Sequence, residues 1–290
     1  MKKFKILIPV YNDWQSLSKL LNIIDNEIKN LTHEISIIII DDASTFNRQL
    51  EIENLSNIDT IKILSMKENK GHARCIATGL KYIFEKEEFD YVIPMDGDGE
   101  DRPEEIIEFI KSSENTPEQT IVGERVKRSE AFLFKFCYFF HKIITLVFTG
   151  HSIKFGNFTC LTKSTVKKMI DDKATWNSFS GALTKVDKNK ITIPSTRGER
   201  YFGPSKMSFP NLINHSLSII SVFKNAVLIR SALFIILYIL MIKSNASIIT
   251  AIPLIFLLIM IYLISNLALR ENIEEFDKAL SNIKEIEKLK

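Results

Sequence analysis

Asp96 and Asp98, separated by a single glycine, are the residues of this chain best suited to chemistry. They directly follow the apolar run 91–95, which is typical of a buried strand, and the glycine lets the backbone turn so that both carboxylates can converge. Paired carboxylate oxygens suit Mg²⁺ or Mn²⁺, ions that keep several waters and bind diphosphates. With Glu100 and Asp101, four acids lie so close in sequence that they would repel one another without a cation among them. The alternative, a solvated acidic turn that caps the next helix, suits Asp101 better than the Asp96 and Asp98 pair.

Short apolar runs alternate with helical periodicities in the part of the chain that must position these acids. The runs predict buried strands at 4–10, 35–40, 60–66, 91–95 and 120–123, and the periodicities predict helices at 17–28, 73–84 and 106–110. This alternation predicts an α/β fold with a mostly parallel sheet and flanking helices, in which ligands bind at the carboxyl ends of the strands. Tyr11 and Asp13 follow the first strand and Asp42 follows the second, so the same edge should gather polar residues from several strands. No GxGxxG follows any predicted strand, which disfavours a dinucleotide-binding domain.

The composition is that of a globular protein: 46% of the 290 residues are hydrophobic, 25% are charged, and the net charge is +3. So small a charge, with no dense basic run, argues against nucleic acid as a partner. Three widely separated cysteines form neither a disulfide framework nor a zinc site, which fits a reducing compartment. The apolar run 6–10 is too short for a signal peptide, so we expect the N-terminal part to stay in the cytoplasm.

Two long apolar stretches, 226–242 and 246–269, follow one another with only three residues between them. The second is long enough to cross a bilayer. The first, about 25 Å long at 1.5 Å per residue, can span if Lys224 lies at the interface and Arg230 snorkels. We therefore predict a transmembrane hairpin at 223–269, against the alternative of a buried hairpin in a soluble protein. The basic residues on both flanks predict that both ends face the cytoplasm.

Two further segments complete the predicted organisation. The run 131–148 is apolar and rich in aromatic residues but interrupted by lysines, which favours an interfacial helix about as well as a buried core helix. The tail 270–290 has charged residues and apolar positions at helical spacing, and we predict an amphipathic helix, either a short coiled coil for self-association or a surface helix. The expected domains are a cytoplasmic catalytic domain at 1–222, the hairpin at 223–269 and the tail at 270–290.

Four motifs in register resemble the nucleotide-sugar half of family-2 glycosyltransferases, which have a GT-A fold. They are Ile8-Pro9-Val10-Tyr11-Asn12-Asp13, Ile40-Asp41-Asp42-Ala43-Ser44, Asn69-Lys70-Gly71-His72-Ala73-Arg74 with Gly79, and Met95-Asp96-Gly97-Asp98-Gly99-Glu100 with Pro103-Glu104. The segments 156–158 and 200–206 and the hairpin are similar to the polyprenyl-phosphate branch, which includes dolichol-phosphate mannosyltransferases and bacterial undecaprenyl-phosphate glucosyltransferases. The resemblance covers 4–269, nearly the whole chain.

The resemblance implies a role for each matching residue. The nucleotide sugar would contact Pro9, Tyr11, Asp13, Asp42, Lys70, Arg74 and Asp96. The metal would bind Asp96, Asp98 and Glu100, and the lipid phosphate would meet Arg125, Arg128 and Ser205. The catalytic set would be Asp96, Asp98, Arg200 and Lys206, the last two from the segment that closes over the phosphates. Two residues depart from the family pattern. The family usually has Glu at the position of Asp13 and often has Gln at the position of Glu100. For Lys70, Arg125 and Arg128, a solubilising surface role is as good an interpretation.

The implied reaction is coherent as chemistry. Transfer from a UDP- or GDP-linked sugar needs a stabilised diphosphate leaving group, which a divalent ion and cationic side chains supply. A hydroxyl acceptor also needs a general base, whereas a phosphate monoester with a second pKa near 6 is already anionic at neutral pH. We therefore expect a membrane enzyme of the cytoplasmic membrane that transfers the sugar to a polyprenyl (undecaprenyl) phosphate, with inversion as the family implies.

Two alternatives stay open. The first is a glycosyltransferase that acts on a hydroxyl of a glycolipid or cell-surface glycan, for which Asp101 and Asp187 are poor candidate bases. The Gln-x-x-Arg-Trp motif usual in processive polysaccharide synthases is missing from this sequence. The second is a membrane scaffold that binds nucleotide sugar without catalysis, against which the paired aspartates argue.

Overall fold

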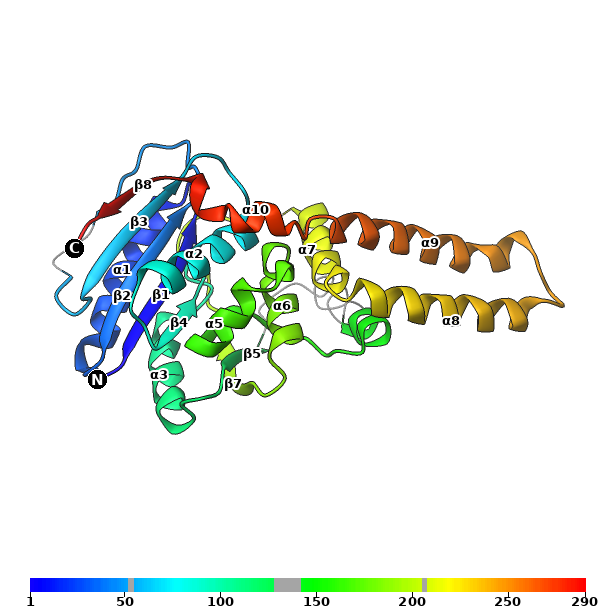
Figure 1. Ribbon diagram of the computed structural model, residues 1–290, viewed down its shortest axis with the longest axis horizontal. Helices are drawn as coiled ribbons and strands as arrows, with labels where there is room; N and C mark the ends of the chain where they lie inside the picture. The colour runs from blue at the N-terminus through cyan, green and yellow to red at the C-terminus, as the bar shows by residue number, and fades with distance from the viewer. Residues whose placement is uncertain (52–54, 128–141, 205–207) are drawn as a thin grey trace.

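The computed structural model describes residues 1–51, 55–127, 142–204 and 208–290, and it is built around one mixed sheet (Figure 1). The strands lie in the order β7-β5-β6-β4-β1-β2-β3-β8. Their bounds are β1 Lys3–Val10, β2 Glu34–Asp41, β3 Thr60–Met66, β4 Tyr91–Pro94, β5 Ile121–Lys127, β6 Phe155–Thr162, β7 Ile191–Thr196 and β8 Ile283–Lys288. The strands β4, β1, β2 and β3 are mutually parallel, so the carboxyl ends of β1, β2 and β4 meet at one edge.

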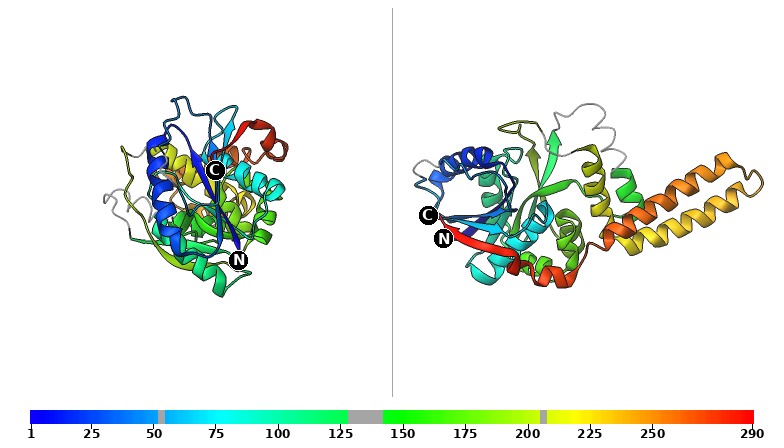
Figure 2. Two further views of the ribbon diagram at one scale, coloured as in Figure 1. Left: turned by 90° about the vertical axis from the view of Figure 1, so that its left-hand side faces the viewer. Right: turned by 90° about the horizontal axis from the view of Figure 1, so that it is seen from above.

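Helices cover both faces of this sheet, as the α/β prediction requires. Their bounds are α1 Trp14–Glu27, α2 His72–Lys86, α3 Ile106–Asn115, α5 Lys163–Ile170, α6 Phe179–Val186 and α7 Phe209–Ser221. Short 3-10 turns occupy Ile28–Asn30, Pro103–Glu105, Lys173–Trp176 and Ala279–Asn282. One core packs α1 and α3 on the sheet, and a second packs α2, α5 and α6 on the opposite face (Figure 2).

Strand β2 shows why its sequence does not alternate between apolar and polar residues. Ile37 and Ile39 belong to the core under α1, whereas Ile38 and Ile40 belong to the core under α2. Both faces of this central strand are therefore buried, and every position from 37 to 40 must be apolar.

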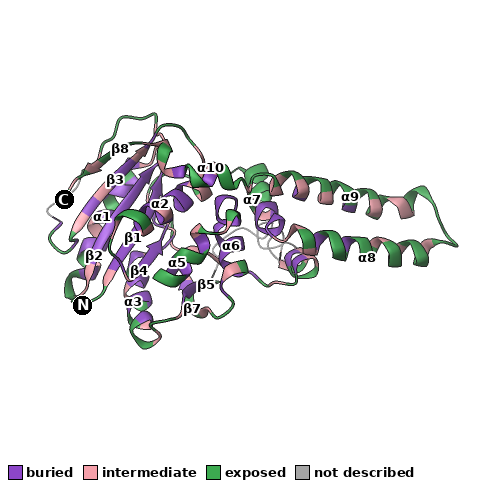
Figure 3. Cartoon of the chain, viewed as in Figure 1, coloured by how far each residue is buried: buried purple, intermediate pink, exposed green. Residues whose placement is uncertain are grey.

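The predicted hairpin is present and projects away from the sheet (Figure 1). It consists of α8, Lys224–Ile242, and α9, Ile248–Ala268, both long and apolar enough to cross a membrane. Only Val227 and Ser231 are buried in α8, and only Leu257 and Ile264 in α9 (Figure 3). An apolar surface so exposed is the opposite of a soluble core hairpin, and it fits a pair of helices surrounded by lipid.

The base of the hairpin is packed on the α/β part of the chain. Leu217 of α7, Val227 of α8 and Ile264 of α9 share one small core, on which Phe148 also packs. Residues 142–149 are helical, in keeping with the predicted helix at 131–148, but 131–141 lie outside the described residues. Whether this segment lies at a membrane interface stays a prediction.

The prediction of one amphipathic helix across 270–290 is wrong. The tail forms a short helix, α10 Ile273–Asp277, a 3-10 turn, and then β8, which pairs antiparallel with β3. Without β8, strand β3 would be an edge strand with unpaired backbone groups. As a strand, the tail supplies hydrogen bonds to these groups, which it could not do as a helix. Ile283 and Leu289, apolar positions at 270–290, pack on the two sheet cores instead of forming a helical stripe.

Candidate active site

The loop 95–101 after β4 brings the predicted aspartates to the sheet edge. Asp101, which is 3% exposed, accepts the backbone N–H of Asp96 on Oδ2 at 2.9 Å. Asp98 Oδ1 accepts the N–H of Glu100 at 3.0 Å. Gly99 has a φ of +91°, and a Cβ there would lie 2.6 Å from the ring of Tyr201. The loop is therefore shaped by its own acids and by a glycine that no other residue replaces without strain.

Asp96 faces two polar residues from other elements. Its Oδ1 lies 3.2 Å from Nε2 of His72, at the start of α2, and 3.5 Å from Nδ2 of Asn157 in β6. Nδ2 of Asn157 is also 2.7 Å from Nε2 of His72. Burial opposes ionisation of Asp96, but the charges of His72 and Arg125 hold its pKa well below the usual range. Asp96 is thus a fixed negative charge.

Asp98 and Asp13 share one arginine. Arg200 Nη2 donates to Asp13 Oδ2 at 2.8 Å, and Arg200 Nη1 forms an ion pair with Asp98 Oδ2. In the same way, Arg197 pairs with Glu100. Burial and the neighbouring charge of Asp96 raise the pKa of Asp98 in spite of the arginine. The segment after β7 therefore lies along the acidic loop, and the predicted contact of Arg200 with phosphates stays a prediction.

Arg125 reaches the same cluster from β5. Its Nη2 lies 3.6 Å from Asp101 Oδ1, and a Cβ at Gly156 would meet that guanidinium at 3.2 Å. Burial and the charge of Asp96 raise the pKa of Asp101 to about 7 despite Arg125. Arg125 thus contacts Asp101 and acts on Asp96 through its charge. Its predicted contact with a lipid phosphate is untested.

Asp42, after β2, is bound by the loop that precedes α2. Its two carboxylate oxygens accept the backbone N–H groups of Lys70, at 2.7 Å, and Gly71, at 2.9 Å. Burial raises the pKa of this carboxyl. Gly71 has a φ of +87°, a conformation that suits glycine. Asp42 therefore holds the loop around Lys70 and Gly71 in place. A contact of Asp42 with a base or ribose stays a prediction.

Lys70 and Arg74 turn toward the C-terminal tail. Glu275 of α10 lies 3.1 Å from Lys70 Nζ and 3.5 Å from Arg74 Nη2, and it accepts the indole N–H of Trp176 at 2.9 Å. Arg74 also stacks over the Trp176 ring at 5.3 Å. Sequence reasoning missed Glu275, because nothing local marks a residue whose partners lie about 100 to 200 positions away.

The remaining predicted residues divide into those near the cluster and those that are not described. Pro9 is paired in β1, and its carbonyl oxygen would lie 3.4 Å from a Cβ at Gly97. Tyr11 follows at the strand end and is 43% exposed. Arg128, Ser205 and Lys206 lie outside the described residues.

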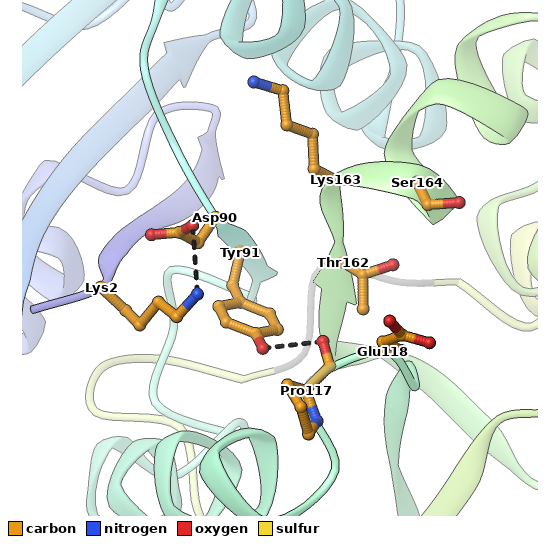
Figure 4. A pocket seen from close by; sticks show the side chains of 8 residues that line it. All are labelled: Lys2, Asp90, Tyr91, Pro117, Glu118, Thr162, Lys163 and Ser164. Atoms are coloured by element: carbon orange, nitrogen blue, oxygen red, sulfur yellow. Dashed lines mark hydrogen bonds and ion pairs between the residues drawn. The ribbon is translucent and has the colours of Figure 1, made fainter.

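Two cavities lined by described residues lie away from the acidic loop. One of about 470 Å³ lies between Lys2, Asp90, Tyr91 and the 162–164 segment, at the amino ends of β1 and β4 (Figure 4). A larger one of about 750 Å³ lies along α1 and reaches Phe202. Lys19, which lines it, sits 4.7 Å above the Tyr201 ring, so this cavity adjoins the loop that carries Arg200.

The donor set at the acidic loop fits a divalent ion such as Mg²⁺ or Mn²⁺. Burial and the charge of Asp96 raise the pKa values of Asp98 and Asp101, and a cation bound at this loop would favour their ionised forms. Among the described residues, no three His, Cys, Asp or Glu side chains form a closed metal cage. An open site of one or two carboxylates completed by phosphate oxygens is the arrangement expected for Mg²⁺.

Comparison with known families decides the classification. Residues 5–173 match the profile described as "Glycosyl transferase family 2", more than half of the chain. The chain belongs to glycosyl transferase family 2. The family expected from the four motifs is thereby confirmed.

One curated relative of this family-2 member is the undecaprenyl-phosphate 4-deoxy-4-formamido-L-arabinose transferase of Proteus mirabilis. The two are 27% identical over 220 residues, which cover 74% of this chain and 65% of the relative. The chain thus spans slightly less than two thirds of that protein.

Solved structures show a similar fold. The glucosyl-3-phosphoglycerate synthase of Mycobacterium tuberculosis, in complex with Mn²⁺, UDP and phosphoglyceric acid, matches with a TM-score of 0.55 and 12% identity over 78% of each chain. The same enzyme with phosphoglyceric acid alone matches with a TM-score of 0.54 and 12% identity, over 78% of this chain and 80% of that one. At this identity the likeness concerns the fold, and it confirms the predicted GT-A-like architecture.

Proposed function

We propose that this family-2 member is a membrane-bound, inverting glycosyltransferase that moves a sugar from a UDP- or GDP-linked donor to a polyprenyl phosphate with the help of a divalent ion. Three observations support the proposal: the acidic loop at the sheet edge, the apolar hairpin, and similarity to an undecaprenyl-phosphate sugar transferase. The Mn²⁺ and UDP bound by the structural neighbour agree with the donor chemistry.

The observation that carries the lipid acceptor is the short path from the hairpin to the acidic loop. Arg230 of α8 donates to the carbonyl of Val147 at 2.9 Å, and its guanidinium lies against Gly150. Asn157, seven residues further along the chain, contacts Asp96. Seven extended residues span at most about 25 Å. The base of the hairpin is therefore joined to the site by a short segment of the chain, along which a headgroup phosphate would approach.

The side chains divide the work of the transfer between them. A divalent ion held by Asp96 and Asp98 would draw charge from the departing diphosphate. Arg200 and Arg197, already aligned along the acidic loop, supply cationic hydrogen-bond donors for phosphate oxygens. Lys206, Ser205 and Arg128 belong to this proposal through the family resemblance alone.

The acceptor assignment is supported by how the two candidate bases are used. Asp101 is buried and binds the Asp96 N–H and Arg125. Asp187 accepts the N–H of Asn189 at 2.9 Å and lies 3.3 Å from the hydroxyl of Thr165. Both carboxylates are thus engaged with groups of the chain itself. A phosphate monoester, which needs no base, agrees better with this arrangement.

We further propose a multi-pass arrangement in the cytoplasmic membrane with the catalytic half in the cytoplasm. Lys224 and Arg230 lie in the first two turns of α8, and Arg270 and Lys278 follow α9. This distribution agrees with the positive-inside rule. The coiled-coil argument for self-association is lost with the predicted tail helix, since β8 belongs to the chain's own sheet.

The test uses the purified full chain in detergent or nanodiscs with Mg²⁺ or Mn²⁺ and a panel of radiolabelled UDP- and GDP-sugars. Undecaprenyl phosphate is the acceptor, and undecaprenol, which differs only by the phosphate, is the matched control. We expect label in a lipid product that mild acid cleaves, with the phosphate acceptor only. Transfer to undecaprenol or to a glycan hydroxyl alone would contradict the proposal.

A further inference from the structure

We propose that Arg200 is an internal counter-ion that competes with the divalent ion for Asp98, so that the ion binds tightly only together with the nucleotide diphosphate. The inference rests on the proposed donor chemistry and concerns how the site is loaded. It follows from the contacts of one guanidinium with two carboxylates that belong to different loops.

The guanidinium of Arg200 joins three segments of the chain. Asp13 stands directly before α1, Asp98 lies in the loop after β4, and Arg200 comes from the segment after β7. The side chains are 20%, 17% and 13% exposed, so the three charges are largely shielded from water. Shielded ion pairs of this kind are costly to separate unless another partner replaces them.

The backbone holds the same segment along the acidic loop. Tyr201 N–H donates to the carbonyl of Asp98 at 2.9 Å, and Gly198 N–H donates to the carbonyl of Glu100 at 2.8 Å. The Tyr201 ring covers Gly99. Arg200 is thus placed beside Asp98 by main-chain contacts that do not depend on its charge, and a change of its side chain can be studied with the loop in place.

Both oxygens of Asp98 accept hydrogen bonds in this arrangement. Oδ1 binds the Glu100 N–H, and Oδ2 binds Arg200. Each oxygen keeps a second lone pair, so an ion could coordinate Asp98 without displacing the Glu100 N–H, but near Oδ2 it would lie beside the like charge of the guanidinium. A single divalent ion and Arg200 cannot both be held closely by the same oxygen without strong repulsion.

The third donor of Arg200 points to what the side chain binds after displacement. Its Nε is buried and has no hydrogen-bond partner among the described residues. A guanidinium has five N–H donors in a fork that matches phosphate oxygens. A diphosphate that arrives with the ion would replace the lost carboxylate contact and satisfy Nε as well. The ion alone brings no such compensation.

This competition predicts effects of opposite sign when the guanidinium is removed. In Arg200→Gln, Mn²⁺ alone should bind about tenfold more tightly, because Asp98 and Asp13 lose their internal partner. UDP or GDP bound with Mn²⁺ should bind about tenfold more weakly, because the diphosphate loses its guanidinium. The free-Mn²⁺ electron paramagnetic resonance signal measures the first affinity, and nucleotide fluorescence anisotropy or calorimetry measures the second.

Arg102→Gln is the matched control. It removes the same charge from a neighbouring arginine, which pairs with Glu104. It should leave both affinities within about twofold of the wild type. Arg200→Lys keeps the charge and serves if the Gln variant fails to fold: it should bind Mn²⁺ alone at least as weakly as the wild type does.

Weaker or unchanged binding of Mn²⁺ alone in a folded Arg200→Gln protein would overturn the competition. A wild-type protein that binds Mn²⁺ but neither UDP nor GDP would overturn the proposed function instead, while the Mn²⁺ titrations of the two variants would still decide the role of Arg200.

Discussion

Two charge clusters flank the start of α2, and they are balanced differently. The acidic cluster, at the sheet edge, holds Asp13, Asp96, Asp98, Glu100 and Asp101 against His72, Arg125, Arg197 and Arg200. The basic cluster, toward the tail, holds Lys70 and Arg74 against Glu68 and Glu275.

The ionisation of their carboxyls shows the difference. In the acidic cluster, burial and neighbouring carboxylates raise the pKa of Asp98 and raise that of Asp101 to about 7. In the basic cluster, burial acts to raise the pKa of Glu275, but hydrogen bonds from Trp176 and Lys70 and the charge of Arg74 hold it below the usual value. The first cluster thus contains carboxyls whose ionisation is opposed, whereas the second keeps its carboxyl ionised. We infer that the first serves the reaction and the second holds the structure together.

The largest expected effect comes from the acidic cluster. Asp98→Asn should lower turnover by about 10²–10³-fold, because one ligand of the proposed ion is lost. The melting temperature should change little, because burial and Asp96 oppose the ionisation of Asp98 and Arg200 keeps Asp13 as its partner. Asp171→Asn, which breaks an exposed pair with Lys167, is the control and should change neither. Turnover that survives in Asp98→Asn would favour the non-catalytic scaffold.

A glycine pair tests how tightly the acidic loop is shaped. Gly99→Ala should destabilise the fold by about 2–3 kcal/mol, because it combines left-handed strain with a clash against Tyr201. Gly203 also has a positive φ, but a Cβ there would meet nothing within 4 Å. Gly203→Ala should therefore destabilise the fold by only about 1 kcal/mol. Chemical denaturation of both variants measures the difference. Equal losses would mean that the Tyr201 contact is unimportant.

Removing the central acid of the basic cluster should affect stability more than catalysis. Glu275→Ala leaves Lys70, Arg74 and the Trp176 indole without their shared acceptor, which should cost about 1–2 kcal/mol. Glu274→Ala, an exposed neighbour in the same short helix, should cost less than about 0.5 kcal/mol. Denaturation midpoints and kcat are measured together. A large loss of kcat with unchanged stability would place Glu275 in the reaction.

Local sequence patterns predicted the elements that carry the acidic cluster. Strand β3 was predicted at 60–66, where it is found, and the paired aspartates follow a buried strand as expected. The reason is that strands buried on both faces, such as β2, need unbroken apolar runs that stand out in the sequence. The family resemblance assigns Asp13, Asp98 and Arg200 to one site, and the structure brings the three side chains into contact.

The tail could not be predicted in the same way, because its structure is decided by partners far away in the sequence. Its apolar positions fit a helix, but the open edge of β3 binds it as a strand. Glu275 meets Lys70 across 205 positions, a contact that no local pattern marks. His72 and Asn157 were part of recognised motifs, yet their approach to Asp96 depends on how β6 pairs with β4.

The smallest expected effect is the change with pH of the stability that Glu275 contributes. The pKa of Glu275 is shifted in the opposite direction from those of Asp98 and Asp101 in the acidic cluster. Because its pKa is lower in the folded state than the ordinary 4.5, Glu275 contributes stability that is fully present above pH 4.5. That contribution is lost as the pH falls below this value and through the folded-state pKa. The difference in unfolding free energy between the wild type and Glu275→Gln should therefore be constant from pH 6 to pH 8 and shrink toward pH 3, as urea titrations at each pH would show. A difference that instead grows on acidification would mean that Glu275 is held protonated, and the basic cluster would then not be the balanced one.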